Sequence, residues 1–203
     1  DVYKRQGLSR KVKRDPIFWH TVAVSFLKKW GGDPCNFLAD CDYHGPTILK
    51  RLVSDKHMRN KSMINDFPFL KGPKISCLWI RMLRDNVGLE LNGLEDVPIP
   101  VDVHVLRSTL CTGILRGKYN GRVRPIFQEV RDVWKEATAG VKLPGSDREM
   151  IALDVDEPLW HLSKFGCSKR GNGNLGPCPK DCLVQGCSDG YVKISGSTCK
   201  VDT

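Results

Sequence analysis

The stretch Phe69-Leu70-Lys71-Gly72-Pro73-Lys74-Ile75-Ser76 decides the fold of this 203-residue chain. Gly72 next to a proline is typical of a tight turn, and the residues from Lys74 to Arg84 have the apolar spacing of a helix. A second helix is expected just before the turn, near Asn60–Asp66. Residues 60–85 are therefore predicted to form a hairpin of two helices, whose exposed amides suit the binding of one phosphate.

Lys74 stands in the first turn of the second helix. The positive end of the helix dipole and partial burial both favour the neutral amine there, and a nucleophilic amine must be neutral. The sequence therefore nominates Lys74 as a nucleophile. The alternative is an ordinary surface lysine on a helix pair that only binds.

A second informative segment is Val97-Pro98-Ile99-Pro100-Val101-Asp102-Val103-His104. The prolines keep the chain extended, and Asp102 falls at the N-cap of the next helix. A capping carboxylate stays ionised, which suits a group that stabilises a cation developing on a sugar. The spacing from Lys74 permits the two helix starts to meet. A role as a helix cap alone is the alternative for Asp102.

The remaining pattern is helical nearly throughout, and we expect an all-α fold. Val87–Leu91 alternates like an extended segment, and Asn92-Gly93 is typical of a turn. Helices are expected at Asp15–Trp30, Pro34–Asp40, Pro46–Val53, Val103–Leu115, Pro125–Thr138 and Asp156–Phe165, with a short one from Ser146 or Asp147.

These elements together resemble the helix-hairpin-helix (HhH-GPD) DNA glycosylases. The order and spacing of Lys74-Ile75 with Arg81-Met82, of Pro98–Asp102 and of Leu153–Trp160 are similar to the archaeal 8-oxoguanine DNA glycosylases. Phe18–Ala23 resembles an early helix of that branch more loosely. The resemblance covers residues 15–166 and implies a two-lobed helical glycosylase domain at 7–166.

The resemblance implies a bifunctional DNA glycosylase and AP lyase of base excision repair. Lys74 would attack the deoxyribose, displace an oxidised purine, 8-oxoguanine above all, and form a Schiff base before β-elimination. Asp102 would stabilise the sugar cation and orient the lysine. Gly72, Lys71 and His104 would contact double-stranded DNA that contains the damaged base.

The same resemblance nominates a pocket for the flipped base. Trp160 would stack on the base, Asp156 would read its edge, and Trp19 would supply the opposite stacking face. Arg81 stands where the family has a lysine, which keeps the charge but changes its geometry. Core aromatics for the two tryptophans and a helix cap for Asp156 are the alternatives.

The C-terminal segment 167–203 is rich in Gly, Cys and Asn, and we expect loops around a bound centre. Cys167, Cys178, Cys182 and Cys187 follow the last expected helix, at a position that resembles the [4Fe–4S] site of endonuclease III-like glycosylases. Four thiolates suit an iron–sulfur cluster or tetrahedral zinc, and disulfides or unbound thiols remain alternatives. The other cysteines in helical contexts, Cys35, Cys41, Cys77 and Cys111, are expected to be buried thiols.

Composition limits the remaining classes. The formal net charge of +9 favours a polyanionic partner, and the odd count of nine cysteines argues against a pure disulfide framework. Apolar runs are too short for a membrane span, and no leader is recognised. Asp1–Gln6 resembles the translation of an adapter used in sequencing libraries, so we exclude residues 1–6 from the fold.

The leading hypothesis is therefore an oxidised-purine DNA glycosylase and AP lyase, expected to be a monomer in the prokaryotic cytoplasm, associated with the nucleoid. An endonuclease III-like glycosylase for oxidised pyrimidines is the second hypothesis, and the cysteine segment favours it. A non-catalytic DNA-binding module is the third. Lys74 paired with Asp102 separates the enzymes from the module, because a binding module needs no nucleophile.

Overall fold

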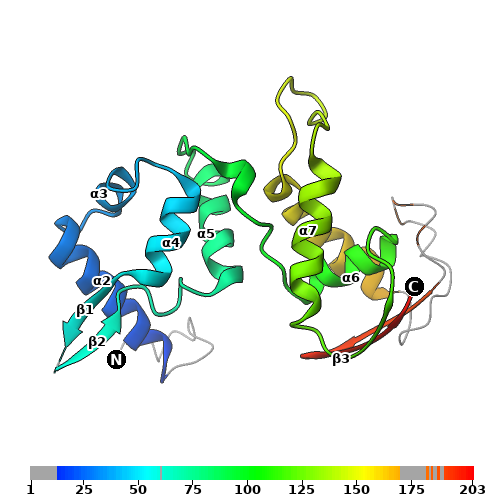
Figure 1. The fold of residues 1–203 in the computed structure, drawn as a ribbon, viewed down its shortest axis with the longest axis horizontal. Coiled ribbons are helices and arrows are strands. Elements are labelled where there is room, and N and C mark those ends of the chain that lie inside the picture. Colours follow the sequence, from blue (N-terminus) through cyan, green and yellow to red (C-terminus); the bar gives the residue numbers. More distant parts are fainter. Residues whose placement is uncertain (1–12, 60, 170–181, 183, 185–186, 188–189) are drawn as a thin grey trace. The chain divides into compact units, whose positions relative to one another are not determined.

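The computed structural model describes residues 13–59, 61–169, 182, 184, 187 and 190–203 (Figure 1). In this part of the chain, seven α-helices are accompanied by two small antiparallel sheets. The predicted all-α fold is therefore wrong, and the fold is mixed. The chain divides into two compact units, residues 1–96 and 97–203, and each has its own core.

The first unit contains four helices and one β-hairpin. The helices largely follow the predicted ranges, each within about two residues at its ends. They are α2 (Asp15–Trp30), α3 (Pro34–Ala39), α4 (Gly45–Ser54) and α5 (Pro73–Asp85), and a short 3-10 turn, η1 (Leu94–Asp96), closes the unit.

Aromatic side chains make the core of the first unit. Phe26 and Trp30 from α2 meet Phe37 from α3 and Phe67 from the segment before α5. The ring centroids of Trp30 and Phe37 are 4.9 Å apart, and those of Phe37 and Phe67 are 5.0 Å apart, within the range of favourable aromatic pairs. α2 ends at Gly31, whose φ of 63° is the left-handed conformation that glycine adopts without strain.

The hairpin occupies the segment predicted as the first helix of a helical pair. Strands β1 (Lys56–Arg59) and β2 (Ser62–Asn65) pair antiparallel, from Lys56 opposite Asn65 to Arg59 opposite Ser62. The side-chain amide of Asn65 donates to the backbone oxygens of Leu52, Val53 and Asp55 and so satisfies the C-terminal end of α4. These long-range contacts favour the strand pair, so the helix predicted at 60–66 is wrong, and so is the helical hairpin at 60–85.

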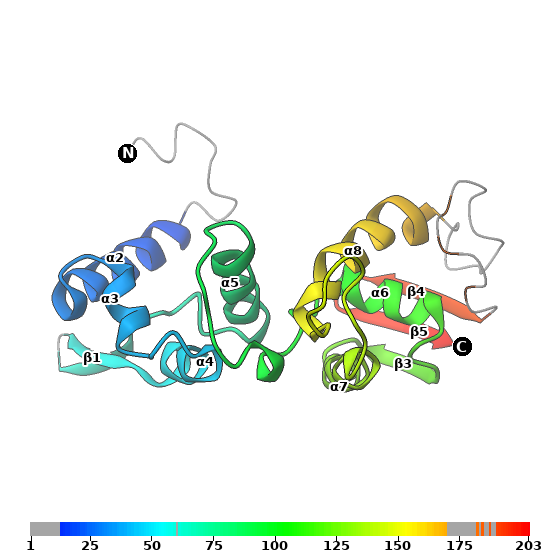
Figure 2. The same cartoon turned by 90° about the horizontal axis from the view of Figure 1, so that it is seen from above.

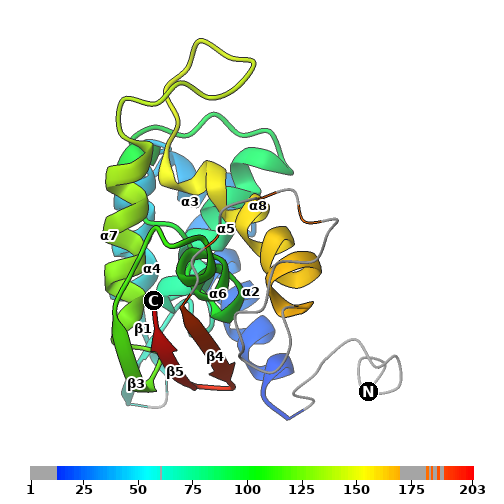
Figure 3. The same ribbon diagram turned by 90° about the vertical axis from the view of Figure 1, so that its right-hand side faces the viewer.

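The second unit surrounds α6 (Val103–Thr112) with two further helices and a three-stranded sheet (Figure 2). Strands β3 (Lys118–Arg122), β5 (Thr198–Asp202) and β4 (Tyr191–Ser195) lie side by side in that order, all antiparallel (Figure 3). The other elements are α7 (Ile126–Thr138), η2 (Ala152–Val155), α8 (Asp156–His161), a π-helical turn η3 (Leu162–Gly166) and the turn η4 (Cys167–Lys169).

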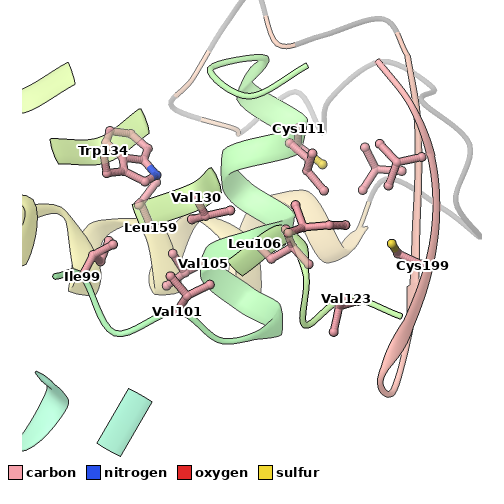
Figure 4. Close-up of a cluster of buried hydrophobic side chains, with 14 of the residues drawn as sticks. Ile99, Val101, Val105, Leu106, Cys111, Val123, Val130, Trp134, Leu159 and Cys199 are labelled. Carbon is pink, nitrogen blue, oxygen red and sulfur yellow. The ribbon is translucent and has the colours of Figure 1, made fainter. Parts of the chain in front are cut away.

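Aliphatic side chains and thiols make the core of the second unit (Figure 4). Val105 and Leu106 of α6 are fully buried, and Val192 and Val201 contribute from the sheet. Residues 191–202 were expected to be loops, but alternate positions of both strands are buried against this core. The alternating apolar positions fix the strands, because one face of the sheet is buried.

Three smaller expectations also differ from the structure. Within residues 86–97, η1 is the only helix or strand, and the extended segment expected at Val87–Leu91 forms no strand. Lys142 and Glu149 form an isolated β-bridge around the turn where a short helix was expected. α6 ends at Thr112 rather than Leu115, because Gly113 adopts a left-handed φ of 77°. None of the helices in the described residues is both long and apolar enough to cross a membrane.

Candidate functional site

Lys74 is the second residue of α5, as the sequence predicts. The helix starts after Gly72, without a side-chain cap, and Pro73 stands at its first position. Gly72 has a φ of −70°, and a Cβ built there would lie 3.8 Å from the backbone oxygen of Phe69. The turn therefore exists, but neither its backbone conformation nor its packing requires a glycine.

The turn uses part of the hydrogen-bonding capacity that was expected to hold a phosphate. The backbone N–H of Lys71 donates to the oxygen of Phe67 at 3.0 Å. The N–H and the hydroxyl of Ser76 both donate to the oxygen of Gly72, at 2.9 and 3.0 Å. Lys71 is exposed, so its side chain, rather than its amide, is the group that could meet a ligand.

Asp102 is the N-cap of α6, as predicted. Its Oδ1 accepts hydrogen bonds from the backbone N–H groups of His104 and Val105, at 2.8 and 3.0 Å. Val101 before it is fully buried, so the approach to the helix is fixed by packing as well as by Pro98 and Pro100. Two backbone donors favour the ionised carboxylate, which is the form needed next to a developing cation.

Lys74 belongs to the first unit and Asp102 to the second. The pairing of these two side chains therefore stays a prediction. The same division separates the nominated base pocket, since Trp19 and Arg81 lie in the first unit and Asp156 and Trp160 in the second.

In the second unit, the start of α6 and the end of α8 bring several of the nominated residues together. The ring centroids of His104 and Trp160 are 5.5 Å apart, and the Nζ of Lys164 lies 4.4 Å from the centroid of the indole. Asp156 precedes Trp160 by one helical turn and is buried, with 6% of its surface exposed. The sequence nominated His104, Trp160 and Asp156 as members of a site, and it placed Lys164 only among the basic residues expected to face DNA.

Ser163 of η3 contacts two side chains of α6, His104 and Arg107. It is fully buried, its Oγ accepts a hydrogen bond from Arg107 at 3.1 Å, and it lies 3.3 Å from Nδ1 of His104. The Ser163 hydroxyl has a second lone pair and a proton, so it accepts from or donates to Nδ1 according to the tautomer of the imidazole. The contact orients the ring of His104, whose backbone N–H donates to the capping carboxylate of Asp102. No local pattern indicates Ser163, because a single serine in a helix carries no signal of its own.

The first-unit nominees have ordinary surroundings. The side chain of Trp19 is 46% exposed on α2. Arg81 donates to Asp85 one turn later on α5, at 3.3 Å, and is mostly buried. This ion pair orients the guanidinium along the helix.

Thiols collect at the C-terminal end of α6. Cys111 in the last turn of α6 and Cys167 after η3 are both buried in the core of the second unit. The pKa of Cys167 is raised strongly, first by a hydrogen bond with Cys111, then by burial and by the charges of Cys111, Cys187 and Cys182. The Sγ of Cys182 would lie 3.5 Å from a Cβ added to Gly166, directly before Cys167.

Three of the four predicted ligands, Cys167, Cys182 and Cys187, therefore lie near one another, and the fourth, Cys178, is outside the described residues. Cys111 was expected to be an isolated buried thiol but belongs to this group. As the described residues stand, no three His, Cys, Asp or Glu side chains are arranged to hold a metal ion. The described cysteines form no disulfide, and Cys35, expected to be buried, is exposed on α3.

No protein-family model, curated protein or solved structure matches this chain. The assignment of a function therefore depends on the chemistry of its own residues.

Proposed function

We propose that the protein is a DNA glycosylase with AP lyase activity, which removes an oxidised purine, 8-oxoguanine above all, from double-stranded DNA. The observation that carries the proposal is the carboxylate of Asp102, held at the start of α6 by two backbone N–H groups beside the His104–Trp160 pair. The proposal does not use the helical hairpin, since residues 56–59 and 62–65 form strands. A protein acting in this way would work at the nucleoid of a prokaryotic cell.

The proposed reaction uses two groups of the chain. The Nζ of Lys74 bonds to C1′ of the deoxyribose while the bond from C1′ to the base breaks, and the base leaves with that electron pair and takes up a proton. The nitrogen then loses a proton and its lone pair forms the C1′=N bond while the C1′–O4′ bond breaks; the ring oxygen takes up a proton, and the product is the Schiff base. Removal of a proton from C2′ then breaks the C3′–O bond, which cuts the strand.

Asp102 would orient the lysine and, as the ionised carboxylate, stabilise the positive charge that develops on the sugar. The ammonium of Lys74 would lose its proton to solvent before it attacks. The indole of Trp160 offers an aromatic face for the extruded base, and the buried Asp156 offers a carboxylate for its edge. The ammonium of Lys164 over the indole adds a positive charge next to that face, where DNA phosphates approach.

Borohydride trapping tests the reaction. The wild-type protein should form a covalent adduct with a duplex that contains one 8-oxoguanine, because borohydride reduces the Schiff base. Lys74→Ala should form none, whereas Lys71→Ala, its neighbour in the turn, should still form the adduct. Asp102→Asn should slow adduct formation by at least about a hundredfold, as expected for loss of an electrostatic stabiliser.

The same assay distinguishes the competing functions. A duplex with thymine glycol in place of 8-oxoguanine tests the oxidised-pyrimidine glycosylase. If neither duplex is trapped while the protein still binds DNA, the chain is a binding module, and the enzymatic proposal is wrong. An adduct formed by Lys74→Ala would show that another amine is the nucleophile.

We also infer that the cysteines gathered near the C-terminal end of α6 hold a metal centre, either an iron–sulfur cluster or a zinc ion. An all-thiolate donor set suits either, and such a centre would supply structural cross-linking rather than redox chemistry. Cys167, Cys178, Cys182 and Cys187 are the ligands that the sequence suggests, and Cys111 lies against Cys167 as a further thiol.

Elemental analysis and colour test this inference. A brown protein with iron and sulfide indicates the cluster, and a colourless protein with zinc indicates the single ion. Cys167→Ser should lose the metal, whereas Cys35→Ser, which changes an exposed thiol in the other unit, should keep it. Cys111→Ser will lower the metal content if Cys111 is a ligand. A wild-type protein that binds neither metal contradicts the inference.

A further inference from the structure

The outward face of the three-stranded sheet carries an unusual set of side chains. Strand pairing places Lys118, Asp202 and Tyr191 in one row, Asn120, Lys200 and Lys193 in the next, and Arg122, Thr198 and Ser195 in the last. The opposite face is buried, with Val192, Cys199 and Val201 in the core. All the outward residues are exposed except Tyr191, which is half-buried.

The charge on this outward face is strongly unbalanced. Lys118, Arg122, Lys193 and Lys200 oppose a single carboxylate, Asp202, which lies 3.2 Å from the Nζ of Lys118. Across the described part of the chain, no acidic side chain forms an ion pair with Lys193, Lys200 or Arg122. The sheet therefore presents three cations with no acidic partner in that part of the protein.

The central row places two of these cations against each other. Lys193 and Lys200 are direct cross-strand partners on the same face. Like charges in this position destabilise a sheet, so the pair is unfavourable for folding unless an anion lies over it. Asn120 flanks Lys200 on the other side and adds an amide donor to the same row.

The remaining residues on this face are hydrogen-bond donors of the kind that proteins use on DNA phosphates. Contacts to the sugar–phosphate backbone come mainly from Arg and Lys and from Ser, Thr, Asn and Tyr side chains, and these types fill every outward position except Asp202. A hollow of about 280 Å³ opens at one end of the face, and its lining includes Lys118, Tyr191 and Lys200. Lys200 lies 6.0 Å from the centroid of the Tyr191 ring, which holds the two side chains together beside the hollow.

We propose that the outward face of the β3–β5–β4 sheet binds the sugar–phosphate backbone of DNA, with Lys193 and Lys200 on the same stretch of phosphates. The inference takes DNA as its ligand from the proposed function. It adds a binding surface made by β3, β4 and β5, none of which carries Lys74 or Asp102. The contact is to the backbone, so it is independent of base sequence and of damage.

The test compares two double variants of the full chain on a short fluorescent duplex without a lesion. Lys193→Gln/Lys200→Gln removes the facing pair. Lys135→Gln/Lys142→Gln removes two exposed lysines from α7 and the loop after it, which are not on the sheet. Fluorescence anisotropy over a range of salt concentrations gives the affinity and its salt dependence for each protein.

The sheet variant should bind about tenfold more weakly at low salt, and the slope of log affinity against log salt should fall by about 0.9 for each lost phosphate contact. The α7 variant should bind like the wild-type protein. Without DNA, the sheet variant should melt at the same temperature as the wild-type protein or slightly higher, because the facing charges are gone. Weaker binding together with undiminished stability separates a lost contact from a misfolded sheet.

Equal affinity and equal salt slope for the wild-type protein and the sheet variant would overturn the proposal, as would an equal loss in the α7 variant. The proposal would also be wrong if the wild-type protein did not bind the duplex, or if it bound RNA instead of DNA. The result is independent of the trapping assay. If no adduct forms but the sheet variant still binds more weakly, the catalytic proposal fails and the DNA-binding face stands.

Discussion

The two sheets of the molecule are held in place by different forces. The β1–β2 hairpin is fixed by a buried carboxylate, Asp66, whose oxygens contact the hydroxyl of Ser25, the ammonium of Lys29 and Nδ1 of His57. The β3–β5–β4 sheet is fixed by alternate apolar residues such as Val192 and Val201. A buried polar cluster loses much of its stabilising effect when one partner is removed, because the other groups are left unpaired. An apolar face loses stability in proportion to the volume removed.

The largest difference in stability between the two sheets should appear when the aspartate that supports each one is removed. Asp66→Ala removes a fully buried carboxylate from beside Lys29 and His57 and should cost about 3 kcal/mol of stability in the first unit. Asp202→Ala removes an exposed partner of Lys118 and should cost at most about 1 kcal/mol. Hydrogen exchange of the strand amides, read by mass spectrometry, measures each unit separately. Equal effects would mean that Asp66 is not the anchor of the hairpin.

Truncating an apolar residue should reverse this ranking, because the β3–β5–β4 sheet should then lose more stability than the β1–β2 hairpin. Val201→Ala leaves a small cavity in the core of the second unit and should cost about 2 kcal/mol. Ile64→Ala acts on a half-buried strand residue of the hairpin and should cost about 1 kcal/mol or less. The same exchange experiment provides the measurement. A larger loss for Ile64→Ala would show that the hairpin also depends on apolar packing.

The smallest effect is the pH dependence of the hairpin. Burial raises the pKa of Asp66, but the hydrogen bonds and charge of Lys29 and the hydrogen bond of His57 outweigh it, so the net pKa lies below the ordinary value. A carboxyl with a lowered pKa in the folded state contributes stability above its unfolded pKa, near 4, and loses it as the pH falls through the folded value. The protection of the β1–β2 amides, which is their exchange relative to the intrinsic rate at each pH, should therefore fall below about pH 4 in the wild-type protein. Asp66→Asn should be less stable at neutral pH and lack this dependence, and a wild-type profile that is flat down to pH 3 contradicts the assignment.

Local sequence signals predicted the helices well and both sheets poorly. Proline at the start and glycine at the end located α2 closely, and the capping Asp102 located the start of α6, because caps act within one turn. The β1–β2 hairpin depends on Lys29 and Ser25, which are far from it in the sequence, so no local pattern reveals it. The β4 and β5 strands were hidden by the glycines and cysteines around them, although Tyr191–Ser195 alternates as a strand should.

Local patterns also revealed only part of the candidate site. Asp102 was predicted as a helix cap because its role is local, and the structure confirms the two hydrogen bonds. Ser163 was missed, and the place of Lys164 over the indole was not foreseen, because both depend on His104 and Trp160 from other turns and helices. Cys111 was missed for the same reason, since its relation to Cys167 exists only in the folded unit.

The antiparallel pairing of β3 with β5 sets the order in which the second unit can form. The backbone N–H of Gly117 donates to the hydroxyl of Thr203, 86 positions later, so β5 closes a long loop before the sheet can form. Contacts so distant in sequence slow folding, and during synthesis they cannot form until β5 has left the ribosome. Until then, Val105 and Leu106 lack part of their cover, and the nascent chain exposes an apolar surface that a chaperone can recognise.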